Sequence, residues 1–282
     1  MRRSRGCCFL ARVRIAPPLE GLSRVAMADE HADHPGIIAP AVMSLLSRVE
    51  YAVEVATWTH YWMGLFVVCR SFLFRKYTPN FSNRIVSIVH AIAAIYYSVQ
   101  TFENGFASLF ENVGGANTKP QALCMAVSLS YFIYDLCYCA MVGEMESVVH
   151  HLFTIAGLAS GLLNGKSGAE LVGCLFLMEV SNPSLHLRDI LRELKLKDGP
   201  IGSANDLFFA VAFLVCRLVI GPFIVYETVM CPHNELVVKL GGLGILVVSV
   251  KWSVKIVKMI AKEVKKLSGG KSAKTSSEKK TN

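Results

Sequence analysis

Charged residues are scarce in this sequence of 282 residues. Asp, Glu, Lys and Arg make up 18% of the chain, whereas soluble domains contain about 25%. The nine cysteines include no Cys-x-x-Cys pair and no metal-like spacing, so we expect neither a bound metal nor a cofactor. No internal repeat is visible, and the alternating pattern of a β-barrel is missing as well. These absences argue against a soluble domain, a zinc module and a repeat protein.

Long apolar segments take the place of the missing charge. Hydrophobic residues make up 53% of the chain, and a helix needs about 20 mainly apolar residues to cross a membrane. Without β-barrel alternation, helices alone satisfy the backbone in lipid. The sequence therefore predicts an all-α polytopic membrane protein with about seven transmembrane helices. The seven segments are 55–74, 85–101, 121–142, 148–164, 169–187, 207–230 and 236–257.

The basic residues are distributed unevenly between the two sides of this predicted bundle. With the C-terminus in the cytosol, the cytosolic segments hold eighteen Lys and Arg, and the opposite side holds three when the chain is counted from Met27. Cytosolic loops are enriched in Lys and Arg, so we expect a lumenal N-terminus and a cytosolic C-terminus. The ten lysines from Lys251 onward follow a membrane segment without an aromatic-interleaved groove. We therefore expect them to contact anionic lipid and not nucleic acid.

Residues 1–26 differ from the rest of the chain. They contain six arginines and one acid, Glu20. This composition is typical of an organelle transit peptide. It also fits a segment upstream of a translation start at Met27, which the orientation above favours. Whether residues 1–26 belong to the mature chain is left open by the sequence.

Beyond this basic extension, we divide the chain into a lumenal segment over 27–50, a transmembrane domain over 51–260 and a basic cytosolic tail over 261–282. The sequence ends in Lys279-Lys280-Thr281-Asn282, which is similar to a dilysine retrieval signal of endoplasmic-reticulum membrane proteins. Such signals are addresses read by a receptor. We therefore predict that the protein resides in the endoplasmic-reticulum membrane.

Ionisable side chains occur within several apolar segments. His150 and His151 open one segment, and Asp135 lies in the preceding one. Such groups usually face a bundle interior or a wet cavity, and they are candidates for function. Thr154 shares a helix face with His150, whereas His151 points about 100° away, so both rings cannot face one point equally. We expect Asp135 to orient one imidazole, which could then act as a base; an interhelical hydrogen bond without chemistry is the alternative.

A second polar set follows in the next segments. Glu179, Asn182 and His186 have the spacing i, i+3, i+7 of one helix stripe. Pro183 lies inside this stripe and is expected to kink the helix or free a carbonyl. Arg217 of the following segment is expected to pair with Glu179 or Asp135, or to bind a lipid phosphate. Two explanations of this set remain open. The residues bind lipid or support its binding, or they form a polar seam between helices.

Three segments, in this order, resemble the TLC domain family, which includes the ceramide synthases and several non-synthase relatives. They are YFIYD ending at Asp135, HHLFT beginning at His150, and ELVGCLFLMEVSNPSLHLRDIL. The resemblance covers about residues 50–260 and is strongest for the small TLC-domain-containing proteins. It implies a six-helix TLC-type bundle around a lipid cavity that admits an acyl chain. It also implies that His150 and His151 are the paired catalytic histidines of the family and Asp135 their acid.

This sequence differs from the ceramide synthases at one later helix. In the synthases, this helix carries a His-Asp pair and a second Asp three residues on. Met178, Glu179 and Asn182 stand at these positions here. The synthase motif before this helix is also unrecognisable, and there is no homeobox-like insertion. These departures argue against ceramide synthesis, whereas the lipid cavity remains expected.

We therefore expect a protein that acts in lipid homeostasis by binding an acyl lipid or sphingolipid in its bundle. The alternative is an acyl-CoA-dependent acyltransferase in which His150 or His151 is the base or acyl acceptor, Asp135 orients it and Glu179 assists. A lipid transporter is a weaker alternative, because no inverted repeat accompanies the kinked, charged helix. Expected partners are membrane lipids or acyl-CoA, and other membrane proteins in a homo- or hetero-oligomer. The sequence leaves open the lipid, the oligomeric state and whether the protein is an enzyme.

Overall fold

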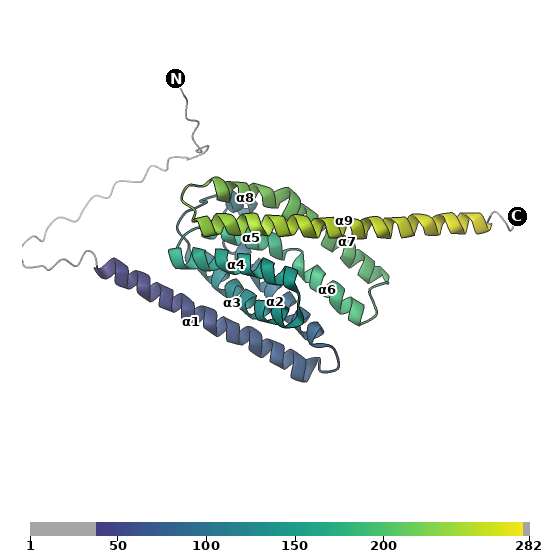
Figure 1. The fold of residues 1–282 in the computed structure, drawn as a ribbon, viewed down its shortest axis with the longest axis horizontal. Helices are drawn as coiled ribbons and strands as arrows, with labels where there is room; N and C mark the ends of the chain where they lie inside the picture. The colour runs from purple at the N-terminus through teal and green to yellow at the C-terminus, as the bar shows by residue number, and fades with distance from the viewer. Residues whose placement is uncertain (1–37, 279–282) are drawn as a thin grey trace, which may run out of the picture. The chain divides into compact units, whose positions relative to one another are not determined.

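The apolar segments fold into helices throughout the described part of the chain (Figure 1). The structure, a computed structural model, describes residues 38–278. The predicted extension over 1–26, residues 27–37 of the 27–50 segment and the terminal Lys279 and Lys280 lie outside the described residues. The helices are α1 (Ile38–Val68), α2 (Pro79–Val99), α3 (Lys119–Val142), α4 (Met145–Asn164), α5 (Gly168–Glu179), α6 (Asn182–Glu193), α7 (Pro200–Leu214), α8 (Gly221–Met230) and α9 (Leu236–Glu278), with short π-helical turns η1 (Cys69–Leu73) and η3 (Val215–Ile220) and a 3-10 turn η2 (Gly105–Phe110).

Each predicted apolar segment falls largely within these helices. Among the described residues, three helical stretches are long and apolar enough, by length and composition, to cross a membrane. They are Lys119–Val142, Pro200–Met230 and Leu236–Ala261. The all-helical fold and the membrane character are thereby confirmed. The count of about seven spans stays a prediction.

Local sequence signals set the helix boundaries. Thr78 caps α2, because its hydroxyl accepts a hydrogen bond from the Phe81 amide at 3.2 Å. Thr118 and Gln121 form a reciprocal capping box at the start of α3. Gly143 ends α3 with a φ of 78°, a left-handed conformation that glycine adopts without steric cost. The resulting tight turn brings α4 back against α3.

The predicted segment 169–187 is divided into two helices. α5 ends at Glu179 and α6 begins at Asn182. Pro183 is the physical reason, since a proline has no N–H for the carbonyl of Glu179 and its ring disfavours a continuous helix. The predicted kink at Pro183 is confirmed. The prediction that Glu179, Asn182 and His186 form a stripe on one helix is wrong, because the break separates Glu179 from the other two.

Within the compact unit formed by residues 43–282, α4 is packed between two other helices. It contacts α3 on one side and α9 on the other, while α5 contacts α2, α3, α4 and α8. Glycines permit the close approach of α4 and α9: a Cβ atom on Gly241 would lie 3.4 Å from the Phe153 carbonyl oxygen. This packing buries His150 and His151 of α4, whereas Met145 and Val149 before them stay exposed.

A polar contact joins the first turn of α4 to α9. The Glu146 carboxylate accepts hydrogen bonds from Lys255 Nζ at 2.6 Å and from Trp252 Nε1 at 3.1 Å, and it lies 3.1 Å from Lys251 Nζ. The hydrogen bond from Lys255, followed by those from Lys251 and Trp252, lowers the pKa of Glu146 from its usual 4.5 to about 2. We call this contact the Glu146 clamp.

The Glu146 clamp makes a pH-dependent contribution to stability. Because the pKa of Glu146 is lower in the folded protein, this contribution is complete above pH 4.5 and is lost as the pH falls from 4.5 towards 2. We therefore expect Glu146→Gln to lower the melting temperature at pH 7, and the difference from wild type to shrink below pH 4.5. Thermal unfolding in detergent at several pH values measures both. Glu227→Gln, at an exposed site of α8, is the control; a pH-independent difference for Glu146→Gln would contradict the assignment.

Candidate functional site

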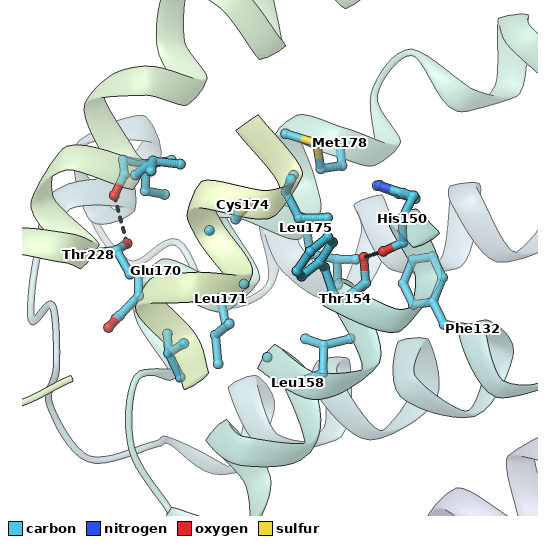
Figure 2. A pocket seen from close by; sticks show the side chains of 18 residues that line it. Phe132, His150, Thr154, Leu158, Glu170, Leu171, Cys174, Leu175, Met178 and Thr228 are labelled. Atoms are coloured by element: carbon cyan, nitrogen blue, oxygen red, sulfur yellow. Dashed lines mark hydrogen bonds between the residues drawn. The ribbon is translucent and has the colours of Figure 1, made fainter. Parts of the chain in front are cut away.

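An apolar pocket lies between α4, α5, α8 and α9, with Phe132 of α3 also in its wall (Figure 2). Its cavity volume is about 60 Å³, which is below the range of about 300–1,000 Å³ that is usual for small-molecule sites. Most of the wall consists of apolar residues, which are Leu, Ile, Val, Phe, Met and Gly. Figure 2 shows His150 and Glu170 towards opposite ends. The pocket therefore has one polar residue near each of its two ends.

The two polar ends differ in their hydrogen bonding. Glu170 accepts hydrogen bonds from the Gly114 amide at 3.0 and 3.2 Å, so its carboxylate already has protein donors. His150 is buried, and its Nδ1 has no hydrogen-bond partner among the described residues. Thr154, which shares the pocket wall, donates its hydroxyl hydrogen to the His150 carbonyl at 3.0 Å. The His150 end is thus the one with an unused polar group.

The paired histidines face different surroundings, as their spacing predicted. His150 lines the pocket, and its ring centroid lies 5.2 Å from that of Trp252 on α9. His151 instead faces Asp135 of α3, with 3.5 Å between Nε2 and Oδ2. The two imidazole centroids are 5.5 Å apart. Asp135 therefore contacts the histidine outside the pocket wall, and His150 is not the ring that it orients.

Asp135 is also held by a residue that the sequence analysis did not single out. Asn83 of α2 is fully buried, and its Nδ2 donates to Asp135 Oδ1 at 2.9 Å. The Asn83 side-chain oxygen in turn accepts a hydrogen bond from the Tyr134 hydroxyl at 2.6 Å. Asn83 thus links α2 to α3 and leaves Asp135 Oδ2 directed towards His151 on α4.

Arg217 is buried beside the His150 end of the pocket. Its Nη2 donates to the Met178 carbonyl at 2.8 Å and to Asn182 Oδ1 at 3.2 Å, and its guanidinium carbon lies 4.6 Å from the Phe213 ring centre. The π-helical turn η3 carries Arg217; it precedes Pro222, which has no N–H for the carbonyl four residues earlier. Local unwinding therefore sets the direction of this side chain.

The predicted ion pairs of Arg217 are replaced by a connection through Asn182. Asn182 Nδ2 donates to Glu179 Oε2 at 2.9 Å, while Asn182 Oδ1 accepts from Arg217. Arg217 therefore reaches Glu179 through the amide, and it forms no ion pair with Glu179 or Asp135 among the described residues. Of the three alternatives for Arg217, a direct pair with Glu179 or with Asp135 is not found among the described residues, and binding of a lipid phosphate stays a prediction. The helix break at Pro183 provides the reason for the missing direct pairs, since it places Asn182 and the Met178 carbonyl nearest the guanidinium.

Two further histidines complete the polar interior. His186, which was predicted from sequence, is buried, with Nδ1 unpartnered among the described residues. His90 of α2 was not predicted. It is fully buried, stacks on Tyr131 with 3.8 Å between ring centroids, and has Nδ1 3.9 Å from Glu179 Oε2. Its position within the apolar segment 85–101 was the available signal.

The chemistry of this arrangement centres on His150. A neutral imidazole in an apolar pocket can donate or accept one hydrogen bond, and it can take a proton from a bound hydroxyl or amine. Arg217 adds a fixed positive charge behind the same end of the pocket. The arrangement thus suits a ligand with a long apolar part and a polar group at one end.

Comparison with known proteins identifies the family. The TLC domain family model matches residues 80–258, a range that includes Asn83, Asp135, both paired histidines and Trp252. TLC domain-containing protein 4 C of Dictyostelium discoideum is 26% identical over 171 residues, which is 56% of this chain and 60% of that protein. TLC domain-containing protein 4 A of the same organism is 22% identical over 214 residues, covering 69% of this chain and 81% of that protein.

These matches confirm the resemblance that the three sequence segments indicated. Both relatives are TLC domain-containing proteins, as the sequence segments led us to expect. The family consists generally of membrane proteins linked to lipid metabolism. The match with the family model extends over more than half of the chain, and the protein belongs to the TLC domain family.

Proposed function

We propose that this protein binds the acyl chain of a lipid in the pocket between α4, α5, α8 and α9, and acts in lipid homeostasis through this binding. The observation that carries the proposal is the apolar pocket with His150 at one end, whose Nδ1 has no hydrogen-bond partner among the described residues. An acyl lipid has the same division into a long apolar chain and a short polar group. Sphingolipids fit this description, since their amide and hydroxyl groups can pair with the imidazole.

The polar group of the ligand belongs at the His150 end. A buried donor or acceptor without a partner costs about 1–3 kcal/mol, so a ligand that pairs with His150 gains by satisfying it. Glu170, at the other end, already accepts two hydrogen bonds from Gly114. The acyl chain therefore extends from His150 along the wall formed by Leu171, Leu175 and Ile224.

We further propose that the chain is a multi-pass protein of the endoplasmic-reticulum membrane, with seven spans, a lumenal N-terminus and a cytosolic C-terminus. The excess of Lys and Arg on one side supports this orientation. In it, the turn before α4 is cytosolic, and His150 lies in the second turn of α4. The polar group of the bound lipid then faces the cytosolic leaflet, where acyl-CoA is also accessible.

An acyl-CoA-dependent acyltransferase is the second candidate. The imidazole of His150 within the pocket favours it, since a base beside a bound acyl group is what acyl transfer requires. The position of Asp135 does not favour it, because this carboxylate contacts His151 and not His150. Release of CoA by the purified protein in the presence of acyl-CoA and an acceptor lipid would favour this candidate over binding alone.

The lipid composition of cells lacking this protein tests the proposal. We expect wild type and His60→Ala, at an exposed site of α1, to restore the altered lipid class. His150→Ala is expected to restore it only at higher expression. Loss of one hydrogen bond of about 1–1.5 kcal/mol corresponds to roughly a tenfold weaker affinity. Equal rescue by His150→Ala at matched abundance and thermal stability would exclude a role for this end of the pocket.

A further inference from the structure

Three side chains with metal-binding atoms converge beside the pocket but outside its wall. Asp135 and Cys139 lie one turn apart on α3, and His151 lies on α4. One potential ligand atom from each lies within 4.8 Å of the other two, and all three residues are buried. The three atoms therefore form a compact triangle between two helices.

The separation between His151 and Asp135 is long for a hydrogen bond. His151 Nε2 lies 3.5 Å from Asp135 Oδ2, whereas an N–H···O hydrogen bond is usually about 2.7–3.2 Å. Cys139 Sγ lies 3.8 Å from the same oxygen, in a weak S–H···O hydrogen bond. Ligands at about 2.0–2.3 Å from a tetrahedral zinc ion are themselves roughly 3.3–3.7 Å apart. These two separations are thus close to the edges of a metal-ligand tetrahedron.

The charges of the three groups also fit a divalent cation. A divalent ion displaces the proton of the Cys139 thiol, and it then neutralises the resulting thiolate and the Asp135 carboxylate together, two charges that would be costly to bury without it. A thiolate with an imidazole and a carboxylate favours zinc over magnesium or calcium, which prefer oxygen ligands alone. The set Asp, Cys and His thus matches the ligand types of zinc.

The surrounding residues orient the ligands and provide a route to them. Asn83 donates to Asp135 Oδ1 at 2.9 Å, which leaves Oδ2 free to face the triangle; such support of ligating carboxylates is usual in metal sites. Glu144, in the α3–α4 turn, has a half-exposed side chain, and its Oε2 lies 4.0 Å from Cys139 Sγ. An acidic side chain thus connects the solvent-exposed turn to the three buried ligands.

We propose that Asp135, Cys139 and His151 bind a zinc ion, with a water molecule as the fourth ligand. The ion joins α3 to α4 next to the pocket, so that the paired histidines have different roles: His150 faces the acyl lipid and His151 holds the metal. This proposal does not depend on the identity or the binding of the lipid.

Metal analysis of the full-length protein tests this site. The protein is purified in detergent with a tag that contains no histidine, dialysed against a weak chelator, and analysed by mass spectrometry for zinc. We expect about one zinc per chain for wild type and for Cys137→Ser, an exposed cysteine on the same helix. Cys139→Ser is expected to retain at least tenfold less, as losses of ligands and their supports usually cause.

Cobalt binding to wild type gives a result that does not depend on the variants folding. Cobalt(II) added to the metal-depleted protein is expected to produce a thiolate-to-cobalt charge-transfer band and the visible bands of a tetrahedral site. Added zinc should remove both. The proposal is overturned if wild type gives no thiolate band, because metal bound elsewhere, for example to other histidines, lacks this signature. Equal zinc contents in wild type and a folded Cys139→Ser variant would overturn it as well.

Discussion

Replacing Asn83 with alanine is expected to lower the melting temperature of this protein by about 10 °C. Asn83 is fully buried and makes two hydrogen bonds, to Asp135 Oδ1 at 2.9 Å and from the Tyr134 hydroxyl at 2.6 Å. Alanine leaves both partners buried and unpaired, at about 1–3 kcal/mol each. A total near 4 kcal/mol, at roughly 2–4 °C per kcal/mol, gives the expected change.

The control for this prediction is Asn80→Ala, one turn earlier on the same helix. The Asn80 side-chain oxygen is buried and has no hydrogen-bond partner among the described residues, so its removal is expected to shift the melting temperature little. Thermal unfolding of both variants in the same detergent, followed by size-exclusion chromatography, gives the comparison. A loss for Asn83→Ala no larger than for Asn80→Ala would mean that the bonds to Asp135 and Tyr134 contribute nothing to stability.

The different directions of the paired histidines could be predicted from sequence, but not which of them faces the pocket. Adjacent residues on a helix always diverge by about 100°. The rotation of α4 about its own axis depends on its packing against α3 and α9, and on the close approach at Gly241. These contacts join residues far apart in the chain. The sequence therefore offered two equivalent candidates where the structure places only His150 in the pocket wall.

The residues that support Asp135 were harder to predict. Asn83 lies on α2, about fifty residues before Asp135, and nothing in its local sequence marks it as a buried polar group. Cys139 follows Asp135 by four residues, so their shared helix face could be predicted. The role of Cys139 in the proposed zinc site could not be predicted, because the third group of the triangle, His151, comes from another helix. Cysteine spacing alone therefore could not indicate this proposed site.

Helix breaks were predicted better than their consequences. Pro183 indicated a kink, and the structure ends α5 at Glu179 and begins α6 at Asn182. The Asn182 amide lies between Glu179 and Arg217. The sequence pattern placed Glu179 and Asn182 as neighbours, but it left open whether Arg217 pairs with Glu179, with Asp135 or with a lipid phosphate, because the partner comes from another helix.

Filling the pocket is expected to have the largest effect on lipid binding. Gly157 lies in the pocket wall on α4, and a Cβ atom there would meet Leu171 Cδ2 at 3.5 Å, an ordinary contact. The Cβ of a methionine therefore fits at this position, and methionine is a better helix former than glycine. Its longer side chain occupies space that the acyl chain needs. Overpacking of about 1–3 kcal/mol corresponds to roughly 5- to 150-fold weaker binding.

A palmitate analogue carrying a diazirine and an alkyne measures this effect, since light couples it to the residues that it contacts. We expect wild type and Gly64→Met to be labelled equally, because a Cβ on Gly64 meets nothing within 4 Å and Gly64 lies on α1, outside the pocket wall. Gly157→Met should be labelled at least tenfold less, and peptide mapping should locate the wild-type label on α4, α5, α8 or α9. Because Gly157→Met keeps every polar side chain, reduced labelling assigns the loss to the pocket space itself. Unchanged labelling would place the acyl chain elsewhere and would remove the basis for assigning His150 to its polar group.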